Sequence, residues 1–370
     1  MSFRTALCEV LGIEYPIMQS GMGGVAGAEL VAEVSRAGGL GILAGLNVPG
    51  QELRKRIQQV RQLTDRPFGV NLWLHSELRP PTDPATIPDS TLRAVQGTLN
   101  GFRRRLGVPA KTERPDPVPD LVDEAIEVIL DERVPVLSSA LGLPDIDLVR
   151  RCWGAGIKVV AMVATVQDAR RAAAAGIDVV VAQGSEAGGH RSTGAKGPSA
   201  QSAGVGTLAL VPQVVDAVSV PVVAAGGIAD GRGLVAALAL GAAGVLLGTR
   251  FVATRESLAQ EFYKKALLES EAESTTVTDA FSGLYARALA NAFTRDYAAS
   301  GAPVLPPLLQ RNAAADVFTA SAAQGDGTYV PLWSGQGVGL VRNLPGAAEV
   351  VEAIIREARA VFKDLGEKIE

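Results

Sequence analysis

Short runs of apolar, mostly β-branched residues recur along this chain, and they constrain its fold more than any other feature. The runs lie at residues 15–20, 40–45, 67–74, 134–140, 157–165, 178–184, 221–227 and 243–249. Stretches rich in Ala and Leu, typical of amphipathic helices, separate them. Runs that are apolar on both faces are typical of parallel strands covered by helices. Eight such repeats favour a closed (β/α)8 TIM barrel over an open doubly wound sheet, which usually has fewer strands.

Two stretches interrupt this rhythm. Residues 76–124 are rich in proline and indicate an irregular excursion with one helix at 91–106. Residues 252–330 directly follow the eighth run and are charged and helical in character. We therefore expect a barrel formed by residues 1–251 plus 331–370. Residues 252–330 would form a smaller inserted helical domain, placed as a lid over the active face of the barrel.

The charge of the chain limits the kinds of molecule it can bind, and its cysteine content indicates the cellular compartment. The net charge of −4 and the pI near 5.5 argue against nucleic acid or an anionic membrane as the main partner. No apolar segment of membrane-spanning length and no signal core is visible. The two cysteines, Cys8 and Cys152, cannot form a disulfide framework and fit a reducing compartment. The sequence predicts a cytoplasmic protein.

Glycines follow the last two predicted strands, where the loops of a TIM barrel form the active face. Gly226 and Gly227 follow the seventh strand, and Gly248 and Thr249 follow the eighth. Exposed backbone N–H groups at such positions hold an anionic phosphate without a basic side chain. The alternative is that these glycines only form tight turns. Because they occur at two consecutive strand ends, we favour a phosphate site for a nucleotide-like cofactor.

The segment "AQGSEAGGHRS" holds His190, one of only two histidines in the chain. It follows the sixth strand and lies among glycines, so the loop can approach a flat ligand closely. An imidazole can accept a proton near neutral pH, which makes His190 a candidate catalytic base. His75, just after the third strand, is given a structural or surface role. No second His or Cys lies at ligand spacing from His190, so we expect no metal site.

Several of these segments together resemble one enzyme family. "YPIMQSGMGG", "GVNLWL", "AQGSEAGGHRS", "VVAAGGIADG" and "GVLLGTRF" occur in this order, and the likeness extends over nearly the whole chain. The chain thereby resembles the nitronate monooxygenases, formerly called 2-nitropropane dioxygenases. That resemblance implies a TIM barrel that binds FMN non-covalently and carries a small domain inserted after the eighth strand.

The resemblance also assigns roles to individual residues. It implies that His190 is the active-site histidine. It implies that the cofactor is bound by the backbone of Met18, Gln19 and Ser20, by the side chains of Asn71 and Gln183, by the close approach of Gly188 and Gly189, and at its phosphate by Gly226, Gly227, Gly248 and Thr249. Ser334 and Gln336 are further candidates near the flavin. Trp333 is expected to be a packing residue.

Two enzymatic functions follow from these likenesses. In the first, alkyl nitronates, or nitroalkanes deprotonated by His190, are oxidised with O2 to carbonyl compounds and nitrite. In the second, the chain is an FMN-dependent enoyl-thioester reductase or an acyl-CoA dehydrogenase or reductase using NAD(P)H, since enoyl-acyl-carrier-protein reductases share the "EAGGH" stretch. A barrel that only binds a phosphate ligand is a third reading. All three have a small-molecule ligand and no nucleic acid or membrane partner; the oligomeric state, homodimer included, is left open.

Overall fold

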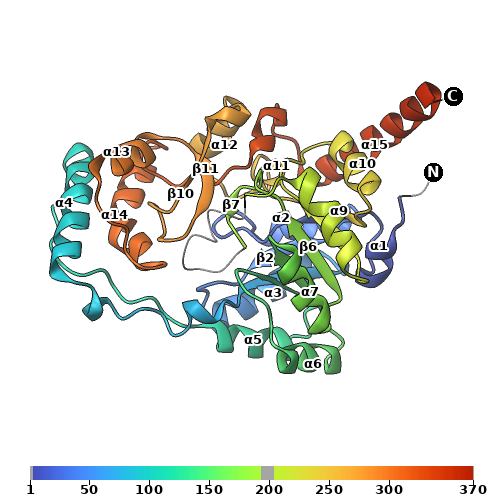
Figure 1. The fold of residues 1–370 in the computed structure, drawn as a ribbon, viewed down its shortest axis with the longest axis horizontal. Helices are drawn as coiled ribbons and strands as arrows, with labels where there is room; N and C mark the ends of the chain where they lie inside the picture. Colours follow the sequence, from blue (N-terminus) through green and yellow to red (C-terminus); the bar gives the residue numbers. More distant parts are fainter. Residues whose placement is uncertain (1–2, 193–203, 370) are drawn as a thin grey trace.

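The predicted strands form a ring in the computed structural model, which describes residues 3–192 and 204–369 (Figure 1). In chain order they are β1 (Ile17–Gln19), β2 (Gly41–Ala44), β3 (Phe68–Trp73), β4 (Val136–Ala140), β5 (Lys158–Val163), β6 (Val179–Gln183), β8 (Val222–Ala225) and β9 (Gly244–Leu247). They are parallel and are hydrogen-bonded in the order β1-β9-β8-β6-β5-β4-β3-β2. The Leu40 N–H donates to the Ile17 carbonyl at 2.9 Å, which joins the start of β2 to β1. The predicted TIM barrel is confirmed.

Helices surround the outside of the barrel (Figure 1). They are α2 (Ala28–Arg36), α3 (Gly50–Leu63), α5 (Val122–Asp131), α6 (Ile146–Gly154), α7 (Val166–Ala174), α9 (Thr207–Ala217), α10 (Gly231–Ala239) and α15 (Ala347–Ile369). The short helix α1 (Ala6–Leu11) has a different position, because its Leu7 and Leu11 join the apolar cluster inside the barrel. Leu7 packs against Gly244 at the start of β9, so α1 closes the amino-terminal end of the ring.

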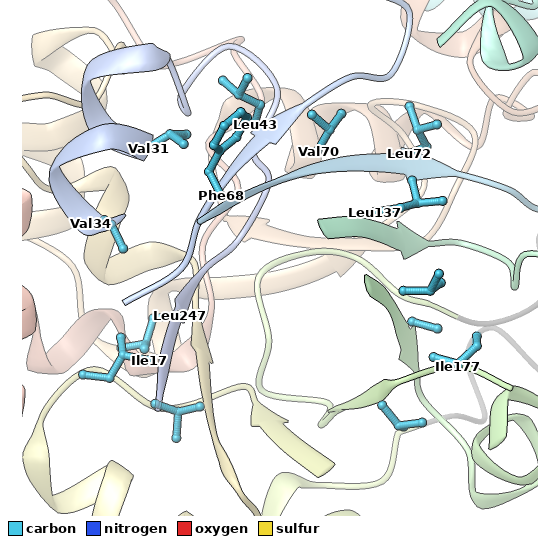
Figure 2. Close-up of a cluster of buried hydrophobic side chains, with 14 of the residues drawn as sticks. Ile17, Val31, Val34, Leu43, Phe68, Val70, Leu72, Leu137, Ile177 and Leu247 are labelled. Atoms are coloured by element: carbon cyan, nitrogen blue, oxygen red, sulfur yellow. The ribbon is translucent and has the colours of Figure 1, made fainter. Parts of the chain in front are cut away.

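The strands are apolar at every position because both of their faces are buried. Val179 and Val181 of β6 point into the barrel, where they join the interior cluster. Val180 and Ala182 point outward into the layer between strands and helices. Figure 2 shows part of this outer layer, with Phe68 of β3 near residues of α2 and β2. Successive side chains of a strand point to opposite faces, and here one face lies in the barrel interior and the other under the helices. Both faces are therefore apolar, which explains the continuous hydrophobic runs of the sequence.

A second apolar core lies beside the barrel, on the left of Figure 1. Its helices, together termed the helical lobe, are α4 (Asp89–Leu106), α13 (Ala292–Ser300) and α14 (Leu309–Ala323). Buried residues between positions 87 and 118 pack there against buried residues between positions 280 and 329. The helix predicted at 91–106 is α4. It belongs to the barrel part in the predicted division of the chain, yet its apolar face contributes to the core of the lobe.

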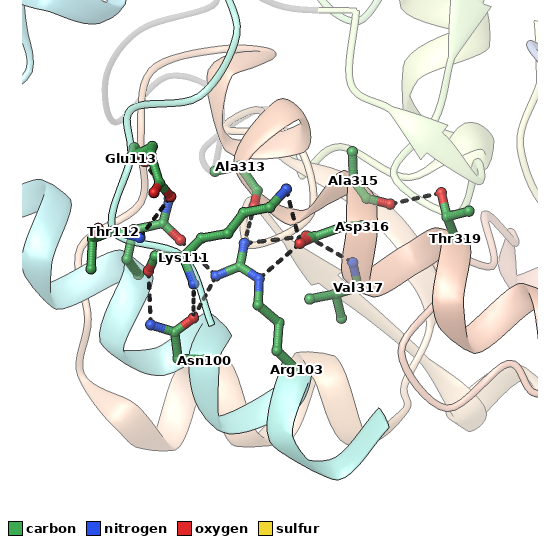
Figure 3. A network of polar contacts seen from close by, with 11 residues as sticks. Asn100, Arg103, Lys111, Thr112, Glu113, Ala313, Ala315, Asp316, Val317 and Thr319 are labelled. Carbon is green, nitrogen blue, oxygen red and sulfur yellow. Dashed lines mark hydrogen bonds and ion pairs between the residues drawn. The ribbon is translucent and has the colours of Figure 1, made fainter. Parts of the chain in front are cut away.

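A buried arginine joins α4 to α14 within the lobe (Figure 3). Arg103 is fully buried, and its guanidinium donates to Asp316 at 2.9 Å and to the Ala313 carbonyl at 2.8 Å. It also donates to Gln96 at 2.7 Å and Asn100 at 2.8 Å on its own helix. A buried guanidinium needs this many acceptors, because each unsatisfied donor away from water is costly. The excursion and the insertion are therefore tied together by one polar network.

The segment at 252–330, in which the sequence indicates helices and loops, also contains two short strands that the sequence did not predict. Besides α12 (Glu261–Leu268), α13 and α14, it holds β10 (Thr275–Thr278) and β11 (Ala286–Leu289). These strands form an antiparallel sheet in the order β10-β11-β7, whose third strand is β7 (Gly189–His190) of the barrel loop. Strands this short leave little periodicity in a sequence, and their partner lies far away along the chain. The remaining elements are α11 (Thr249–Val252), η1 (Ser76–Leu78), η2 (Pro84–Thr86), η3 (Ala272–Ser274) and η4 (Gln336–Leu340).

Candidate active site

A cavity of about 1220 Å³ opens where the barrel strands end at their carboxyl termini. The barrel contributes the loops that follow β1, β6, β8 and β9. The other side of the cavity is formed by the segment inserted after β9 and by its return to the barrel. The lining residues there are Leu258, Ala259, Gln260, Phe262, Tyr263, Phe281, Ser282, Leu308, Arg311, Phe318, Ala322, Val330, Pro331, Trp333, Gly335 and Gly337. Active sites of TIM barrels lie at this face. The cavity is therefore the candidate active site.

The structure brings most of the predicted site residues to this cavity. Those that line it are Ser20, Asn71, Gln183, Gly188, Gly189, His190, Gly226, Gly227, Gly248 and Thr249. Four others lie behind its wall: Met18, Gln19, Ser334 and Gln336. Met18 is fully buried in the barrel core. The site assignments themselves remain predictions.

The residues behind the wall have structural contacts of their own. The Gln19 side-chain oxygen accepts a hydrogen bond from the Ile42 N–H at 3.0 Å, which joins β1 to β2. The Gln336 N–H donates to the Glu186 carbonyl at 2.9 Å. Ser334 is fully buried, and its hydroxyl donates to the Gly335 carbonyl at 3.3 Å. These contacts hold the wall of the cavity in place.

Two glycines after β8 form a cradle of backbone donors. Gly226 has φ +114° and Gly227 has φ +71°, values that L side chains rarely adopt. In residues 3–192 and 204–369 no acceptor binds the N–H group of Gly226 or of Gly227, and both residues line the cavity. Gly248, after β9, also lines it and has no neighbour closer than 3.7 Å to where a Cβ would be. Unpaired N–H donors on a cavity wall fit the phosphate of a bound cofactor.

The two glycines before His190 have different roles. A Cβ on Gly188 would lie 2.4 Å from the Gly335 nitrogen, so this glycine is required for the packing of two chain segments. Gly189 has φ +73° and no atom within 4 Å of where its Cβ would be. It lines the cavity and leaves room there for a flat ligand.

His190 lies in an aromatic part of the cavity wall. Its ring is 4.7 Å from the ring of Trp73 and 4.9 Å from the ring of Trp333, measured between centroids. Its Nε2 forms a hydrogen bond of 2.9 Å with the Ser282 hydroxyl. Burial, and then the charge of Arg311, lowers the pKa of His190 to about 3. The imidazole is therefore uncharged at neutral pH.

Gln183 positions the backbone of His190. Its side-chain nitrogen donates to the His190 carbonyl at 2.9 Å, and its side-chain oxygen accepts from the Ser192 N–H at 2.8 Å. Asn71 lines the cavity beside it and donates to the Ser138 hydroxyl at 3.1 Å. Both ends of the Gln183 amide are thus used to hold the loop that carries the histidine.

Glu186 faces away from the histidine. Its carboxylate accepts from the Thr207 N–H at 2.9 Å and from the Thr207 hydroxyl at 3.0 Å. Thr207 is the first residue of α9, where a carboxylate is favoured by the helix dipole. Although Glu186 lies only four positions before His190 in the sequence, its carboxylate anchors the loop on α9.

Sequence reasoning missed three residues around His190: Ser282, Trp73 and Arg311. Trp333 was expected to pack only, but it also lines the cavity beside the histidine. Ser282 is separated from His190 by 92 positions and reaches it only because β7 pairs with β11. The tryptophans could have been singled out as candidate site residues from the sequence, because the chain has only three. No local pattern marks Ser282 or Arg311.

Other candidate groups lie elsewhere. His75 does not line the cavity. Cys8 and Cys152 are buried and free, and burial raises the pKa of Cys152 to about 11. Among the residues the structure describes, no group of three or more His, Cys, Asp or Glu side chains is arranged to hold a metal ion. Nor is any helix within residues 3–192 and 204–369 long and apolar enough to cross a bilayer.

A closed barrel whose cavity is lined by unpaired glycine N–H groups and an uncharged histidine fits a cofactor-dependent TIM-barrel enzyme. The family model described as nitronate monooxygenase matches residues 4–357. The chain belongs to the nitronate monooxygenase family and is an oxidoreductase. Flavin is a general cofactor of this family.

Individual relatives are similar over their full length. A protein named "Probable nitronate monooxygenase" from Staphylococcus aureus strain MSSA476 is 36% identical over 365 residues, which covers 97% of this chain and 99% of the relative. The solved structure of nitroalkane oxidase from Streptomyces ansochromogenes has a TM-score of 0.87 and 35% identity, covering 98% of this chain and 100% of that one. FabK from Thermotoga maritima has a TM-score of 0.76 and 32% identity, covering 99% of both chains.

Proposed function

We propose that this protein is an FMN-dependent nitronate monooxygenase, which oxidises alkyl nitronates with O2 to carbonyl compounds and nitrite. One observation carries the proposal: a single cavity holds the uncharged His190, its aromatic neighbours, and the cradle of Gly226 and Gly227. Membership of the nitronate monooxygenase family supports it. A cytoplasmic location stays a prediction from the sequence, and the oligomeric state stays open.

The cavity suits FMN in particular. Gly226, Gly227, Gly248 and Thr249 would hold one phosphate through backbone N–H groups. Ser20 and Asn71, which also line the cavity, would lie along the ring system. FMN carries one phosphate, which matches a single cradle.

The protein and the cofactor would have different roles in the reaction. A bound flavin would supply the redox chemistry, taking electrons from the nitronate and passing them to O2. The rings of Trp73 and Trp333 pack against the imidazole of His190. The Ser282 hydroxyl, bound to Nε2, fixes the orientation of the imidazole. Because a pKa near 3 makes the imidazole a weak base, it removes carbon-bound protons slowly. We therefore expect preformed nitronates to be better substrates than neutral nitroalkanes.

The purified protein tests the proposal directly. We expect it to be yellow, and we expect heat or acid to release intact FMN, because no Cys lines the described cavity wall and the one His that does, His190, has its Nε2 hydrogen-bonded to Ser282. In air it should release nitrite from propionate 3-nitronate. A colourless protein that does not take up added FMN would contradict the cofactor assignment. A yellow protein that releases no nitrite would contradict the reaction.

Reduction of an enoyl thioester is the second candidate. The likeness to FabK favours it, and so does the extent of the cavity, which reaches Glu52, Arg56 and Gln59 of α3. That reach gives space beyond what a small nitronate requires. Anaerobic mixing with NADPH separates the two candidates: rapid bleaching of the flavin, followed by reoxidation with an enoyl thioester, would favour the reductase.

A further inference from the structure

Arg311 is a charged residue of the cavity wall whose role the proposed reaction leaves unexplained. It lies in the first turn of α14, its side chain is exposed, and it lines the cavity. In the part of the chain that the structure describes, no carboxylate lies within ion-pair distance of it. Arg56, the other arginine of the cavity wall, pairs with Glu52 at 2.9 Å. Arg311 is thus a cation of the cavity without a carboxylate of this chain to neutralise it.

The surroundings of Arg311 are apolar. Phe281, Leu308 and Phe318 line the same side of the cavity. Burial lowers the pKa of His190, and Arg311 is close enough for its charge to lower that pKa further. The groups facing the histidine from the neighbouring elements are Ser282, Trp73 and Trp333, none of which carries a charge. Because the Arg311 side chain is exposed, water solvates its guanidinium in the free protein, and an anion that enters the cavity can pair with it there.

Helix α14 adds to the positive potential. The first turn of this helix contains no acidic residue, and its N-cap, Leu308, makes no side-chain cap. A helix amino terminus carries the positive end of the helix dipole, where a cation is disfavoured. In the described part of the chain, neither the dipole of α14 nor a carboxylate therefore stabilises the charge of Arg311.

We propose that Arg311 binds a planar pair of anionic oxygens on the substrate and holds that group beside His190. The inference rests on the proposed function and names its substrate class: small nitronates, with or without a carboxylate on the far end. A nitronate and a carboxylate both present two oxygens in one plane, which the guanidinium fork matches with two parallel hydrogen bonds. The apolar wall suits the short alkyl part of such a molecule.

Binding can be tested without turnover. The chain has only two histidines, so a spectrum of labelled imidazoles contains two sets of signals, and His190→Asn assigns them. Titration of the flavin-loaded protein with propionate should shift the His190 signals. Arg311→Gln should weaken propionate binding by about tenfold or more, the scale of a charge-assisted hydrogen bond. Arg311→Lys should retain part of the affinity. Arg295→Gln, which removes an exposed charge from α13, is the matched control and should bind as the wild type does.

Turnover then identifies the bound group. Propionate 3-nitronate carries a nitronate and a carboxylate, whereas ethyl nitronate carries only the nitronate. If kcat/KM of Arg311→Gln falls for both, Arg311 binds the nitronate group; if it falls only for the first, Arg311 binds the carboxylate. Unchanged kcat/KM for both, or propionate binding that is equal in Arg311→Gln and wild type, overturns the inference. If the wild type releases no nitrite but its propionate binding still depends on Arg311, the anion subsite stands and the proposed oxidation is wrong.

Discussion

His190 shows how the surroundings of one residue set its chemistry. A free imidazole is partly charged near pH 6.5, but burial between two tryptophans and the charge of Arg311 lower its pKa to about 3. Ser282 holds the imidazole through Nε2, and Gln183 holds the backbone carbonyl of His190. An uncharged and oriented imidazole can accept a proton or donate a hydrogen bond, without placing a second cation beside Arg311.

Replacement of His190 by Asn separates these two roles. We expect His190→Asn to keep FMN, because the phosphate site that we propose is formed by Gly226 and Gly227. Turnover of neutral nitroalkanes should fall by roughly a hundredfold, the usual contribution of a general base. Preformed nitronates need no deprotonation, so their turnover should fall much less. Nitrite release from both substrates, with FMN content measured alongside, checks this, and His75→Asn is the control.

Two outcomes would contradict that expectation. Equal loss of both activities with FMN still bound would show that His190 binds the substrate and does not take its proton. Loss of neither activity would show that the histidine is structural.

The lowered pKa of His190 also links stability to pH. The folded-state pKa lies below the unfolded value, so between about pH 6.5 and pH 3 the unfolded chain binds a proton that the native protein does not. The free energy of unfolding should therefore fall as the pH falls through this window. Between about pH 7 and about pH 5 the wild type should lose about 1–2 kcal/mol more than His190→Asn. Urea unfolding at both pH values measures the difference, with His75→Asn as control; equal losses in wild type and His190→Asn would exclude the linkage.

At the scale of elements, the ends of neighbouring strands assemble the site. β6 leads into the loop that Glu186 anchors on α9, and β8 ends in the glycine cradle. The Gly335 N–H donates to the Thr249 hydroxyl at 2.9 Å, which places the return segment of the insertion against the end of β9. Because parallel strands end at one edge of the barrel, residues distant in sequence converge there.

Substitution of Gly227 tests the cradle. Gly227→Asp should abolish FMN retention, because it sets a carboxylate against the phosphate. Gly227→Asn is the matched control: it has the same size, carries no charge, and Asn tolerates the left-handed conformation better than most residues. A Cβ here would meet Glu186 at 3.4 Å, an ordinary contact. Flavin absorbance after gel filtration measures retention. Equal FMN content in Gly227→Asp and the wild type would place the phosphate elsewhere.

At the scale of the whole molecule, the helical lobe completes a cavity that the barrel alone leaves open. Leu308, Arg311 and Phe318 of the lobe form part of its wall. The lobe has a core of its own, and the Arg103 network joins the excursion after β3 to the insertion after β9 (Figure 3). The position of this wall therefore depends on contacts between two distant stretches of chain.

Loss of the Arg103 network should loosen the lobe more than the barrel. Arg103→Leu removes one of the two cations that pair with Asp316, leaving Lys111 at 3.0 Å, and it leaves the side-chain oxygen of Gln96 without its donor. Removing one member of a buried ion pair costs about 3–5 kcal/mol, so we expect α4 and α14 to exchange amide hydrogens much faster. The barrel strands should keep their protection, and nitrite release should fall while FMN stays bound. Arg104→Leu, at the exposed neighbouring position, is the control. Unchanged exchange in α4 would contradict a role for Arg103 in holding the lobe.

Much of the barrel was predictable from local sequence. The run at 178–184 is β6 (Val179–Gln183), and the run at 221–227 contains β8 (Val222–Ala225) and the cradle glycines. These features were visible because burial of a strand on both faces leaves a continuous apolar run, and because left-handed backbone selects glycine at single positions. His190 was visible because it stands among glycines after such a run.

The surroundings of His190 were decided only by tertiary structure. β7 and β11 pair across nearly a hundred positions, and that pairing alone brings Ser282 to the imidazole. The joining of α4 to α14 depends on Arg103, which in the sequence looks like one arginine of a solvated basic run. Local patterns record which side of an element is buried, but they do not record which distant element covers it. The sequence by itself therefore determined the barrel, the glycine turns and the histidine. The wall, the charge state of the histidine and the neighbouring arginine follow from long-range packing.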